Sequence, residues 1–420
     1  TFKAGTIGTV AEKTAYGFVM KYFEEESAKN ALEGKPPIVK RKCEIERIAE
    51  GCIDIRRTTG QHPGGIVVLP IGEEIHSFTP VQHPANDMTT SIVTTHFDYH
   101  SIDHNLLKLD ILGHLDPTMI RMLQDLTGID PLEIPLDSKE VMSLFQNTSA
   151  LGIKPEDIGG TKLGALGIPE FGTDFAMQML MDTKPQYFSD LVRIAGLAHG
   201  TDVWLGNAQT LIKEGKATIS TAICTRDDIM IYLIQKGLDS EESFKIMEMV
   251  RKGKVASGKC KEWPEWKQDM IDHGVPDWYI WSCERIKYMF PKAHAAAYVM
   301  MAWRVAYCKV FYPLAYYTAY FSIRATAFDY EKMAMSPVRL EHYIAEYKAK
   351  KAEGTISNTE EDELGVMRIV QEMHARGYEF TPIDIYKAKA RTFQIIDGKI
   401  MPSFKVISKV GEVAGESIEI

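Results

Sequence analysis

The segment from Ala295 to Phe321 is the most apolar stretch of the chain and limits most strongly how the chain can fold. Arg304, Lys309 and Pro313 interrupt it, so that no run of about 18 apolar residues could cross a bilayer. A proline also ends or kinks a helix, because it lacks the amide hydrogen. The segment therefore predicts a buried pair of helices.

The composition is that of an ordinary folded protein. The 420 residues correspond to roughly two or three domains. Apolar residues make up 45% and charged residues 25% of the chain, which excludes a disordered or fibrous protein. The 6 cysteines form no C-x-x-C pair, which argues against a zinc ribbon or a disulfide framework and favours a reducing compartment. The chain starts without Met, and we expect it to be a piece of a longer protein.

The charge distribution leaves a nucleic-acid partner open. The formal net charge of −9 argues at first against such a partner. However, the segment from Arg251 to Lys261 is basic and contains no acidic residue, and Lys387, Lys389 and Arg391 form a second basic run. A binding groove needs positive charge only locally.

The order of the expected elements predicts an α+β fold. Helices are expected over 10–21 and 44–48, followed by strands over 65–70, 94–99 and 106–112. From Asp116 onward the pattern is helical, with helices expected over 118–126, 138–145, 227–236, 240–251, 278–288 and 294–311. A Lys/Glu-rich helix pair follows up to about Gly377, and the last forty or so residues are expected to form a small separate module.

The strand expected over 106–112 carries two charges on one face. Side chains alternate along a strand, so Leu107, Leu109 and Ile111 face one way while Lys108 and Asp110 share the other face. Such a pair is either a salt bridge at a surface edge or part of a site in a cleft. Gly113 follows the strand, where a ligand or another backbone could approach closely.

The strand expected over 94–99 has a polar face, which can be interpreted in three ways. His96, Asp98 and His100 follow Thr94 at every second position. Together with the neighbouring strand they could form the floor of an acidic, metal-accepting cleft, or they could simply be solvated. Alternatively, His96, Asp98 and His100 could bind zinc or manganese together with His104, since imidazole and carboxylate suit those ions. A metal-dependent phosphohydrolase would combine the same three residues with Asp110.

A glycine-rich segment precedes the first expected strand. Arg56, Arg57 and His62 lie next to Gly60, Gly64 and Gly65, a combination that suits close approach to phosphate oxygens. A plain turn that needs glycine at positive φ explains the same pattern equally well.

Two helix ends carry clustered cations. Arg251, Lys252 and Lys254 end one expected helix, where the helix dipole favours positive charge in any case. Lys292 and His294 begin another, where positive charge opposes the dipole. A phosphate bound at this second end would resolve the mismatch.

Taken together, these segments resemble the C-family replicative DNA polymerases, that is, the bacterial DNA polymerase III alpha subunits, and most closely their PolC type. The matching runs occur in the order of the family and cover nearly the whole chain: AGTIGTV (4–10), RTTGQHPGG (57–65), LKLDILG (107–113), GIPEFGT (167–173), HGTDVWLGNAQ (199–209), RKGK (251–254) and FPKAHAAAY (290–298).

The resemblance implies the fold and its domains. Residues 1–115 would be the C-terminal part of a polymerase β-like nucleotidyltransferase palm, and residues 116–327 a mostly α-helical, nucleotide-binding fingers domain. Residues 328–420 would begin an α-rich duplex-binding region. There, Lys409 and Gly411 lie in a segment similar to the first half of a helix-hairpin-helix, which would contact DNA phosphates through backbone N–H groups. Lys409 stands where that pattern usually has glycine.

The resemblance also implies template-directed DNA synthesis with Mg²⁺ as cofactor. Asp110 matches the third of three metal-binding carboxylates, and Lys108 matches the lysine beside it. The first two carboxylates form an Asp-x-Asp run that we do not find in a matching context. We therefore expect that the chain alone does not polymerise DNA.

Further site residues follow from the same motifs. The nucleotide would be bound by Arg57, His62, Gly64, Gly65, His199, Thr201, Asn207, Arg251, Lys252, Lys254, Lys292 and His294. For Asp202 and Trp204 we expect internal packing instead. The expected partners are primer-template DNA and dNTPs, with the sliding clamp and other replisome proteins bound by parts of the parent outside this chain. The expected location is the cytoplasm, at the nucleoid, without membrane contact.

A second class of function stays open beside the polymerase. The chain could be a non-catalytic nucleic-acid-binding or structural fragment with the same fold. An Asp-x-Asp run upstream in the parent gene would distinguish the two.

Overall fold

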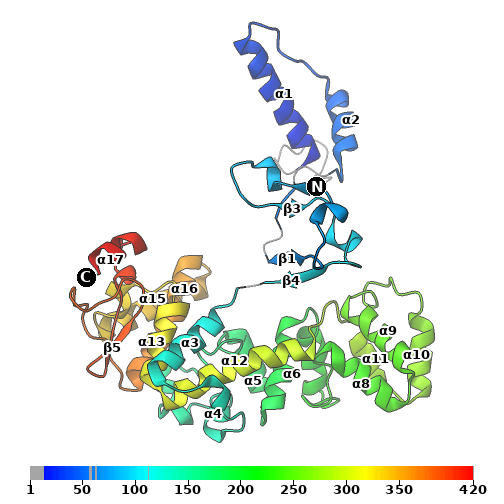
Figure 1. Cartoon of the computed structure of the whole chain (residues 1–420). Helices are drawn as coiled ribbons and strands as arrows, with labels where there is room; N and C mark the ends of the chain where they lie inside the picture. Colours follow the sequence, from blue (N-terminus) through cyan, green and yellow to red (C-terminus); the bar gives the residue numbers. More distant parts are fainter. Residues whose placement is uncertain (1–13, 56–58, 62–63, 112, 420) are drawn as a thin grey trace. The chain divides into compact units, whose positions relative to one another are not determined.

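The computed structural model describes residues 14–55, 59–61, 64–111 and 113–419. It divides the chain into two compact units, Thr1–Gly113 and His114–Ile420 (Figure 1). Arg57, His62 and the run 4–10 lie outside the described residues. The two units are described separately below.

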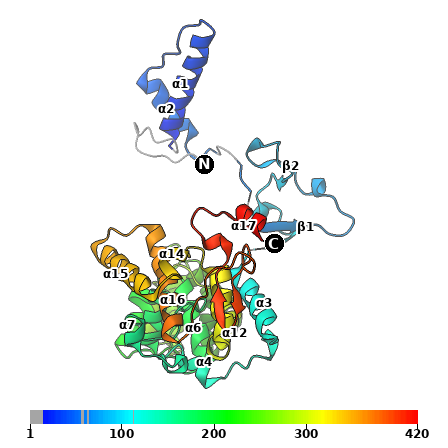
Figure 2. The same ribbon diagram turned by 90° about the vertical axis from the view of Figure 1, so that its left-hand side faces the viewer.

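The first unit begins with a pair of helices that lie side by side (Figures 1 and 2). Helix α1 spans Ala15–Leu32 and α2 spans Lys42–Cys52. The Thr14 hydroxyl caps α1 by accepting a hydrogen bond from the Gly17 amide at 3.1 Å. A small apolar cluster joins the two helices through their buried residues Ala15, Val19, Ile45 and Ala49.

Two short antiparallel sheets complete the first unit. Strand β1 (Gly65–Val68) pairs with β4 (Leu107–Asp110), and β2 (Val81–Gln82) pairs with β3 (Thr94–Thr95). The strands expected over 65–70 and 106–112 are therefore confirmed within a few residues. The strand expected over 94–99 is wrong after Thr95, because the amides of His96 and Phe97 donate to Pro80 O and Thr79 Oγ1.

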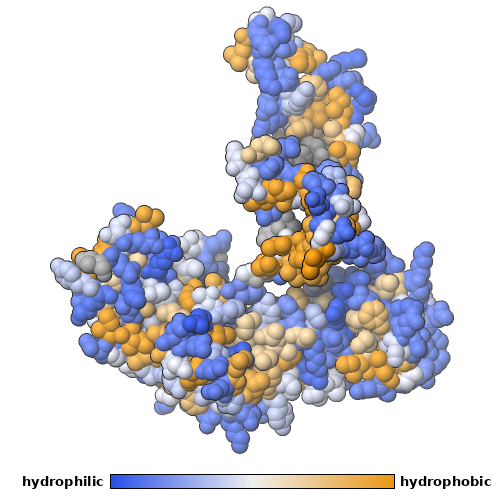
Figure 3. Space-filling view, viewed as in Figure 1, coloured by the Kyte–Doolittle hydropathy of each residue, from blue (hydrophilic) through white to orange (hydrophobic). Residues whose placement is uncertain are grey.

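One face of the β1–β4 pair is apolar and exposed. Its side chains are between 38% and 60% exposed, and Figure 3 shows hydrophobic residues gathered over these strands: Ile66, Val68, Leu107, Leu109 and Ile111. A sheet normally buries such a face against a second layer. Because this apolar face is exposed, we expect the isolated chain to be poorly soluble.

The second unit is mainly helical. Its first helices are α3 (Leu115–Thr127), α4 (Lys139–Ser143), α5 (Asp174–Thr183), α6 (Phe188–His199), α7 (Gln209–Lys213), α8 (Arg226–Lys236), α9 (Ser240–Arg251), α10 (Trp263–Asp272) and α11 (Asp277–Cys283). They are followed by α12 (Lys292–Phe311), α13 (Pro313–Ala319), α14 (Tyr330–Met333), α15 (Pro337–Glu353), α16 (Asn358–Ala375) and α17 (Glu412–Ile418). Strands β5 (Gln394–Ile396) and β6 (Lys399–Met401) form an antiparallel hairpin.

Helix α12 runs through the middle of this unit (Figure 1) and contacts α3, α4, α6, α8 and α13. The predicted buried pair is confirmed, since α12 and α13 meet at Pro313 and bury Trp303, Tyr316 and Tyr317. Within the described ranges, no helix is long and apolar enough to span a membrane.

Of the other expectations for the second unit, some are confirmed and some are wrong. The helix expected over 240–251 is confirmed as α9, whereas the one expected over 278–288 ends at Cys283. It ends early because the amides of Lys287 and Tyr288 turn to the carbonyl of Thr201. Three residues of the expected tail module, Phe393, Ile400 and Val406, belong to the main core of the unit. The domain boundary expected at 327 stays a prediction.

A buried ion pair joins four segments of the second unit. The ammonium of Lys309, on α12, lies 2.8 Å from a carboxylate oxygen of Glu372, on α16, and both side chains are 0% exposed. Lys309 Nζ also donates to Gly164 O at 2.8 Å, and Tyr317 Oη donates to Glu372 at 2.7 Å. Burial lowers the pKa of Lys309 to about 8, while Glu372 opposes that effect.

Replacing Lys309 with Met should destabilise the chain strongly, because it leaves the Glu372 carboxylate buried without its counterion. We expect a loss of about 3–5 kcal/mol in the free energy of unfolding, measured by urea titration with circular dichroism. The double variant Lys309→Met/Glu372→Leu should lose less, since it removes both charges. Equal stability of the single variant and the unchanged chain would contradict a structural role of the pair.

Candidate functional site

In the first unit, strand β4 presents Lys108 and Asp110 on one face, as predicted. Lys108 Nζ lies 3.2 Å from Asp110 Oδ1 and 5.2 Å from the centre of the Tyr99 ring. Asp110 pairs across the ladder with Gly65, which has no side chain, so the space beside the carboxylate stays open. The Asp110 side chain is 56% exposed and is therefore accessible to a cation.

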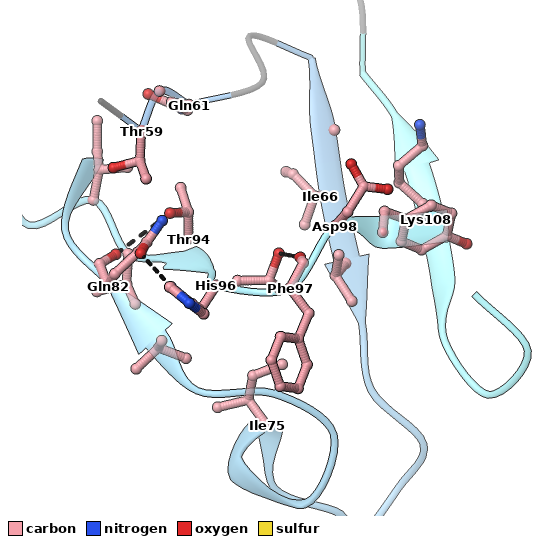
Figure 4. Close-up of a pocket in the computed structure, with 18 of the residues that line it drawn as sticks. Thr59, Gln61, Ile66, Ile75, Gln82, Thr94, His96, Phe97, Asp98 and Lys108 are labelled. Carbon is pink, nitrogen blue, oxygen red and sulfur yellow. Dashed lines mark hydrogen bonds between the residues drawn. The ribbon is translucent and has the colours of Figure 1, made fainter. Parts of the chain in front are cut away.

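A hollow of about 890 Å³ lies next to this face (Figure 4). Asp98 and Lys108 lie at its β1–β4 end, whereas His96 lies at the β2–β3 end beside Gln82. His96 Nδ1 is 2.7 Å from Gln82 Oε1, so its ring has a partner within the protein.

The structure does not support the argument for a metal site at His96, Asp98 and His100. The strand that was to align these residues ends at Thr95, and Tyr99–Ser101 forms a 3-10 turn instead. Throughout the described part of the chain, no three His, Cys, Asp or Glu side chains come together as a metal site. Asp110 offers one exposed carboxylate, which fits a single ligand of a hard cation but cannot hold that cation alone.

In the second unit, the cations at the end of α9 share one acidic partner. Arg251 Nη2 and Lys252 Nζ each lie 2.9 Å from Glu248 Oε2, and the hydrogen bond from Arg251 contributes most to lowering the pKa of Glu248 to about 2. Lys254 is exposed beyond them. Gly253 between them has φ +68°, and a Cβ there would lie 2.5 Å from the carbonyl oxygen of Lys287.

Carboxylates already lie at the start of α12, so the positive charge there does not require a bound phosphate to offset it. The Lys292 amide donates to Asp227 Oδ2 at 2.6 Å, and Lys292 Nζ lies 3.9 Å from Asp228 Oδ1. The side chains of Lys292 and Asp228 are 45% and 15% exposed, so the ammonium remains accessible to an anion.

An aromatic series follows the first two turns of α12. The ring of His294 stacks on that of Phe290, with 5.0 Å between the ring centres. The ring centre of Tyr298 lies 4.5 Å from that of His294 and 4.8 Å from that of His114. His199, at the end of α6, contacts Phe290 at 5.6 Å. The structure therefore brings two predicted nucleotide-binding residues, His199 and His294, to one surface.

Glu170 is the partner of His199 in this cluster. It has φ +68°, a conformation that residues other than glycine rarely adopt, and its carboxylate hydrogen-bonds to His199 Nε2. This bond raises the pKa of His199 against the opposing effect of burial. Burial would raise the pKa of Glu170, but His199, Arg324 and His114 together lower it. For His294, burial and the nearby His199 lower the pKa.

The HGTDVWLGNAQ segment is mainly structural. Asn207 is 1% exposed; its Nδ2 donates to Asp202 O at 2.9 Å, and its Oδ1 accepts a hydrogen bond from the Ser282 hydroxyl at 2.6 Å, so a nucleotide has no access to it. This corrects its assignment as a nucleotide-binding residue. Thr201 pairs through its backbone with Tyr288. Trp204 is buried as expected, whereas Asp202 is exposed and pairs with Lys287 at 2.8 Å.

Lys409 and Gly411 lie in the turn before α17. Lys409 has φ +68°, so its backbone adopts the conformation that favours the glycine of the resembled pattern. Gly411 is the N-cap of α17. Their contact with DNA stays a prediction.

Sequence reasoning did not single out Glu170, Tyr298 or His114 as site residues. Glu170 and Tyr298 lie within two of the matched runs, and this was the signal that could have identified them. His114 and its neighbour Asp116 contact residues about two hundred positions away, for which no local pattern exists.

Replacing Glu170 with Gln should lower the pKa of His199 toward its ordinary value, because the charged partner is lost. Since that pKa is raised in the folded chain, the stabilisation contributed by protonation of His199 is present below pH 6.5, as long as Glu170 stays ionised, and is lost as pH rises through the raised value. An NMR titration of the His199 ring measures the change. An unaltered pKa in the variant would show that Glu170 does not hold the imidazolium.

Two family models match the chain. The bacterial DNA polymerase III alpha NTPase domain matches residues 1–113, and the bacterial DNA polymerase III alpha subunit finger domain matches residues 116–274.

Curated relatives match nearly the whole chain. Proteins named DNA polymerase III PolC-type are 51% identical in Caldanaerobacter subterraneus, 52% in Clostridium perfringens and 53% in Streptococcus suis. Each match covers 99% of this chain but only 28% of the relative, so the chain spans little more than a quarter of their length. The chain belongs to the bacterial DNA polymerase III alpha subunit family, as a PolC-type segment.

Proposed function

We propose that the parent of this chain carries out template-directed DNA synthesis, and that this chain supplies part of its catalytic palm and its fingers. The observation that carries the proposal is the identity of 51% over 99% of the chain to a PolC-type DNA polymerase III. The reaction joins the primer 3′-oxygen to the α-phosphorus of a dNTP, breaks the bond to the bridging oxygen and releases pyrophosphate. The 3′-hydroxyl loses its proton in this step.

Asp110 and Lys108 would serve the catalytic centre. The exposed Asp110 carboxylate on a short, paired strand supports its role as one ligand of Mg²⁺, with the remaining carboxylates supplied by the parent. Mg²⁺ bound there would activate the 3′-hydroxyl and stabilise charge on the phosphates. Lys108 neutralises Asp110 in its absence and offers a cation to a phosphate oxygen. With one carboxylate of three, this chain alone would not polymerise DNA.

The fingers would bind the triphosphate through two cationic helix ends. Arg251, Lys252 and Lys254 follow one helix, and Lys292 and His294 begin another. Glu248 and Asp228 act as their counterions in the free chain. A triphosphate carries more charge than either carboxylate and could take their place. The palm side of the nucleotide site would be completed by Gly64 and Gly65, which lie beside Asp110. Arg57 and His62, which lie outside the described residues, would contribute to the same side.

Other roles follow from the parent enzyme. Primer-template DNA is the proposed macromolecular substrate, and Lys409 and Gly411 would contact its phosphates. The sliding clamp and other replisome proteins would bind parts of the parent beyond this chain. A location at the bacterial nucleoid follows from replication itself.

Replacing Asp110 with Asn in the full-length parent should abolish nucleotidyl transfer while leaving primer-template binding nearly unchanged. The amide keeps the size of the side chain but loses the charge that binds a hard cation. Primer extension with Mg²⁺ and all four dNTPs measures activity, and fluorescence anisotropy measures DNA binding. Loss of DNA binding in this variant would contradict the metal role, and no extension by a well-folded parent would overturn the proposed function.

Replacing Lys292 with Ala should raise the KM for dNTP, with a fall in kcat if the contact strengthens in the transition state. The loss of one charged hydrogen bond corresponds to about 10- to 100-fold in kcat/KM. Steady-state primer extension measures both constants. The matched control is Lys245→Ala, which removes an exposed lysine paired with Glu241 on α9. A nucleotide response equal to that of the control would remove Lys292 from the site.

A further inference from the structure

Glu170 adopts a backbone conformation that suits glycine better than glutamate. Its φ is +68°, which residues other than glycine rarely adopt. The residues around it are firmly packed, since Ile168 and Phe171 are 2% and 1% exposed and the Gly172 amide donates to Ile168 O at 2.9 Å. Strained backbone of this kind is held in place by its surroundings and is common where a side chain has a function. The backbone alone would favour glycine, so the carboxylate is the group that this position supplies.

The carboxylate of Glu170 binds one edge of the His199 ring. It accepts a hydrogen bond from His199 Nε2, and the side chains of Glu170 and His199 are 14% and 42% exposed. Across the described residues, the other ring nitrogen of His199, Nδ1, has no hydrogen-bond partner. A protonated imidazole donates from both of its nitrogens. With Nε2 donating to Glu170, the N–H at Nδ1 is left for an acceptor that is not part of the chain.

The segment before α12 connects His199 to both cationic helix ends. Gly253, in the cationic end of α9, packs against the carbonyl of Lys287 in this segment. The ring centre of Phe290, in the same segment, lies 5.6 Å from that of His199 and 5.0 Å from that of His294 near the start of α12. His199 therefore lies at the surface where the proposed triphosphate site has its other cations.

The charged surroundings favour a proton on His199. Other titratable side chains of the described chain also face this pair: His114, Asp116, His294, Tyr298 and Arg324. Burial would raise the pKa of Glu170, but the hydrogen bond from His199 lowers it, together with Arg324 and His114. The hydrogen bond to Glu170 raises the pKa of His199, whereas burial and His199 lower the pKa of His294. Of these two histidines, His199 is thus the one that carries the positive charge, beside an ionised Glu170.

We propose that Glu170 is a positioning residue of the nucleotide site. Its carboxylate holds the His199 imidazolium at Nε2, so that the N–H at Nδ1 donates to a phosphate oxygen of the bound dNTP. This inference rests on the proposed function and on the assignment of His199 to the nucleotide. Glu170 itself does not contact the nucleotide. It orients the ring and keeps it charged, which strengthens a hydrogen bond to a phosphate.

The test measures the equilibrium Kd of the full-length parent for the complementary dNTP, by titration of a fluorescent primer-template whose primer ends in a dideoxynucleotide. Without a 3′-hydroxyl no bond forms, so binding is measured apart from the reaction. In Glu170→Gln, His199 loses its charged partner and becomes mostly neutral at about pH 8. The dNTP should then bind about 10-fold more weakly than to the parent, because the charged hydrogen bond is lost.

The difference should depend on pH. At about pH 6 an ordinary imidazole is largely protonated, so the Kd of Glu170→Gln should approach that of the parent to within about 3-fold. Titration of the dNTP phosphates affects both proteins equally and cancels in the comparison. A purely structural role of Glu170 would not produce this dependence.

Two further variants separate positioning from a loss of folding. Glu170→Gly removes the carboxylate but adopts a φ of +68° without strain. It should fold as the parent does, by circular dichroism, and bind the dNTP as weakly as Glu170→Gln. The matched control is Asp269→Asn, which removes the carboxylate of another histidine pair, on α10, where His273 Nδ1 lies 3.3 Å from Asp269 Oδ1. Its Kd should equal that of the parent at both pH values.

The double variant Glu170→Gln/His199→Ala shows whether Glu170 acts through His199. It should bind the dNTP no more weakly than His199→Ala alone, since the partner of Glu170 is already absent. An equal loss at both pH values, a Kd of Glu170→Gln equal to that of Asp269→Asn, or additive losses in the double variant would overturn the inference. These outcomes leave the proposed function intact. A well-folded parent that binds no dNTP under these conditions would overturn the proposed function itself.

Discussion

The buried ammonium of Lys309 is the interaction on which the arrangement of the second unit depends. A lysine in a packed interior is stable only when carboxylate and carbonyl oxygens surround it, and Lys309 finds them on α16 and in the segment that precedes Glu170. That segment continues through Gly167, where a Cβ would lie 2.4 Å from the Tyr316 hydroxyl. The position of Glu170, and with it the orientation of His199, thus depends on contacts of α13, of α16 and of the C-terminal part of α12, which lie outside the proposed site.

Three cations of the proposed nucleotide site, Arg251, Lys252 and Lys292, already have carboxylate partners in the free chain. Glu248 holds Arg251 and Lys252, and Asp227 and Asp228 receive the amide and the ammonium of Lys292. These counterions are aligned with the cations by short sequence spacing or by helix packing. A triphosphate would meet an ordered set of donors and would not have to recruit flexible side chains, which lowers the entropic cost of binding.

The first unit, in contrast, has an apolar surface without a covering layer. Its two sheets are short, and the apolar face of β1 and β4 is exposed where a further layer would normally lie. The chain spans 28% of its relatives, and the carboxylates that accompany Asp110 in the resembled family are not found in it. We therefore expect the parent to supply both the layer that covers this apolar face and the remaining carboxylates.

Local periodicity was enough to predict the buried α12–α13 pair, the helix α9 and the face shared by Lys108 and Asp110, because these patterns repeat within a few residues. It failed after Thr95, where alternation of side chains gave no sign that the backbone would bond to Pro80 and Thr79. The family resemblance, in turn, implied that Asn207 binds the nucleotide, whereas packing buries its side chain. The sequence by itself determined which residues carry charge and which faces are apolar. Only the tertiary structure decided which of these residues contact one another. It pairs His114 with Tyr298, Asp116 with Arg324 and Lys309 with Glu372. A pattern along the chain identifies a buried face, but it contains no information about the distant residue that covers that face.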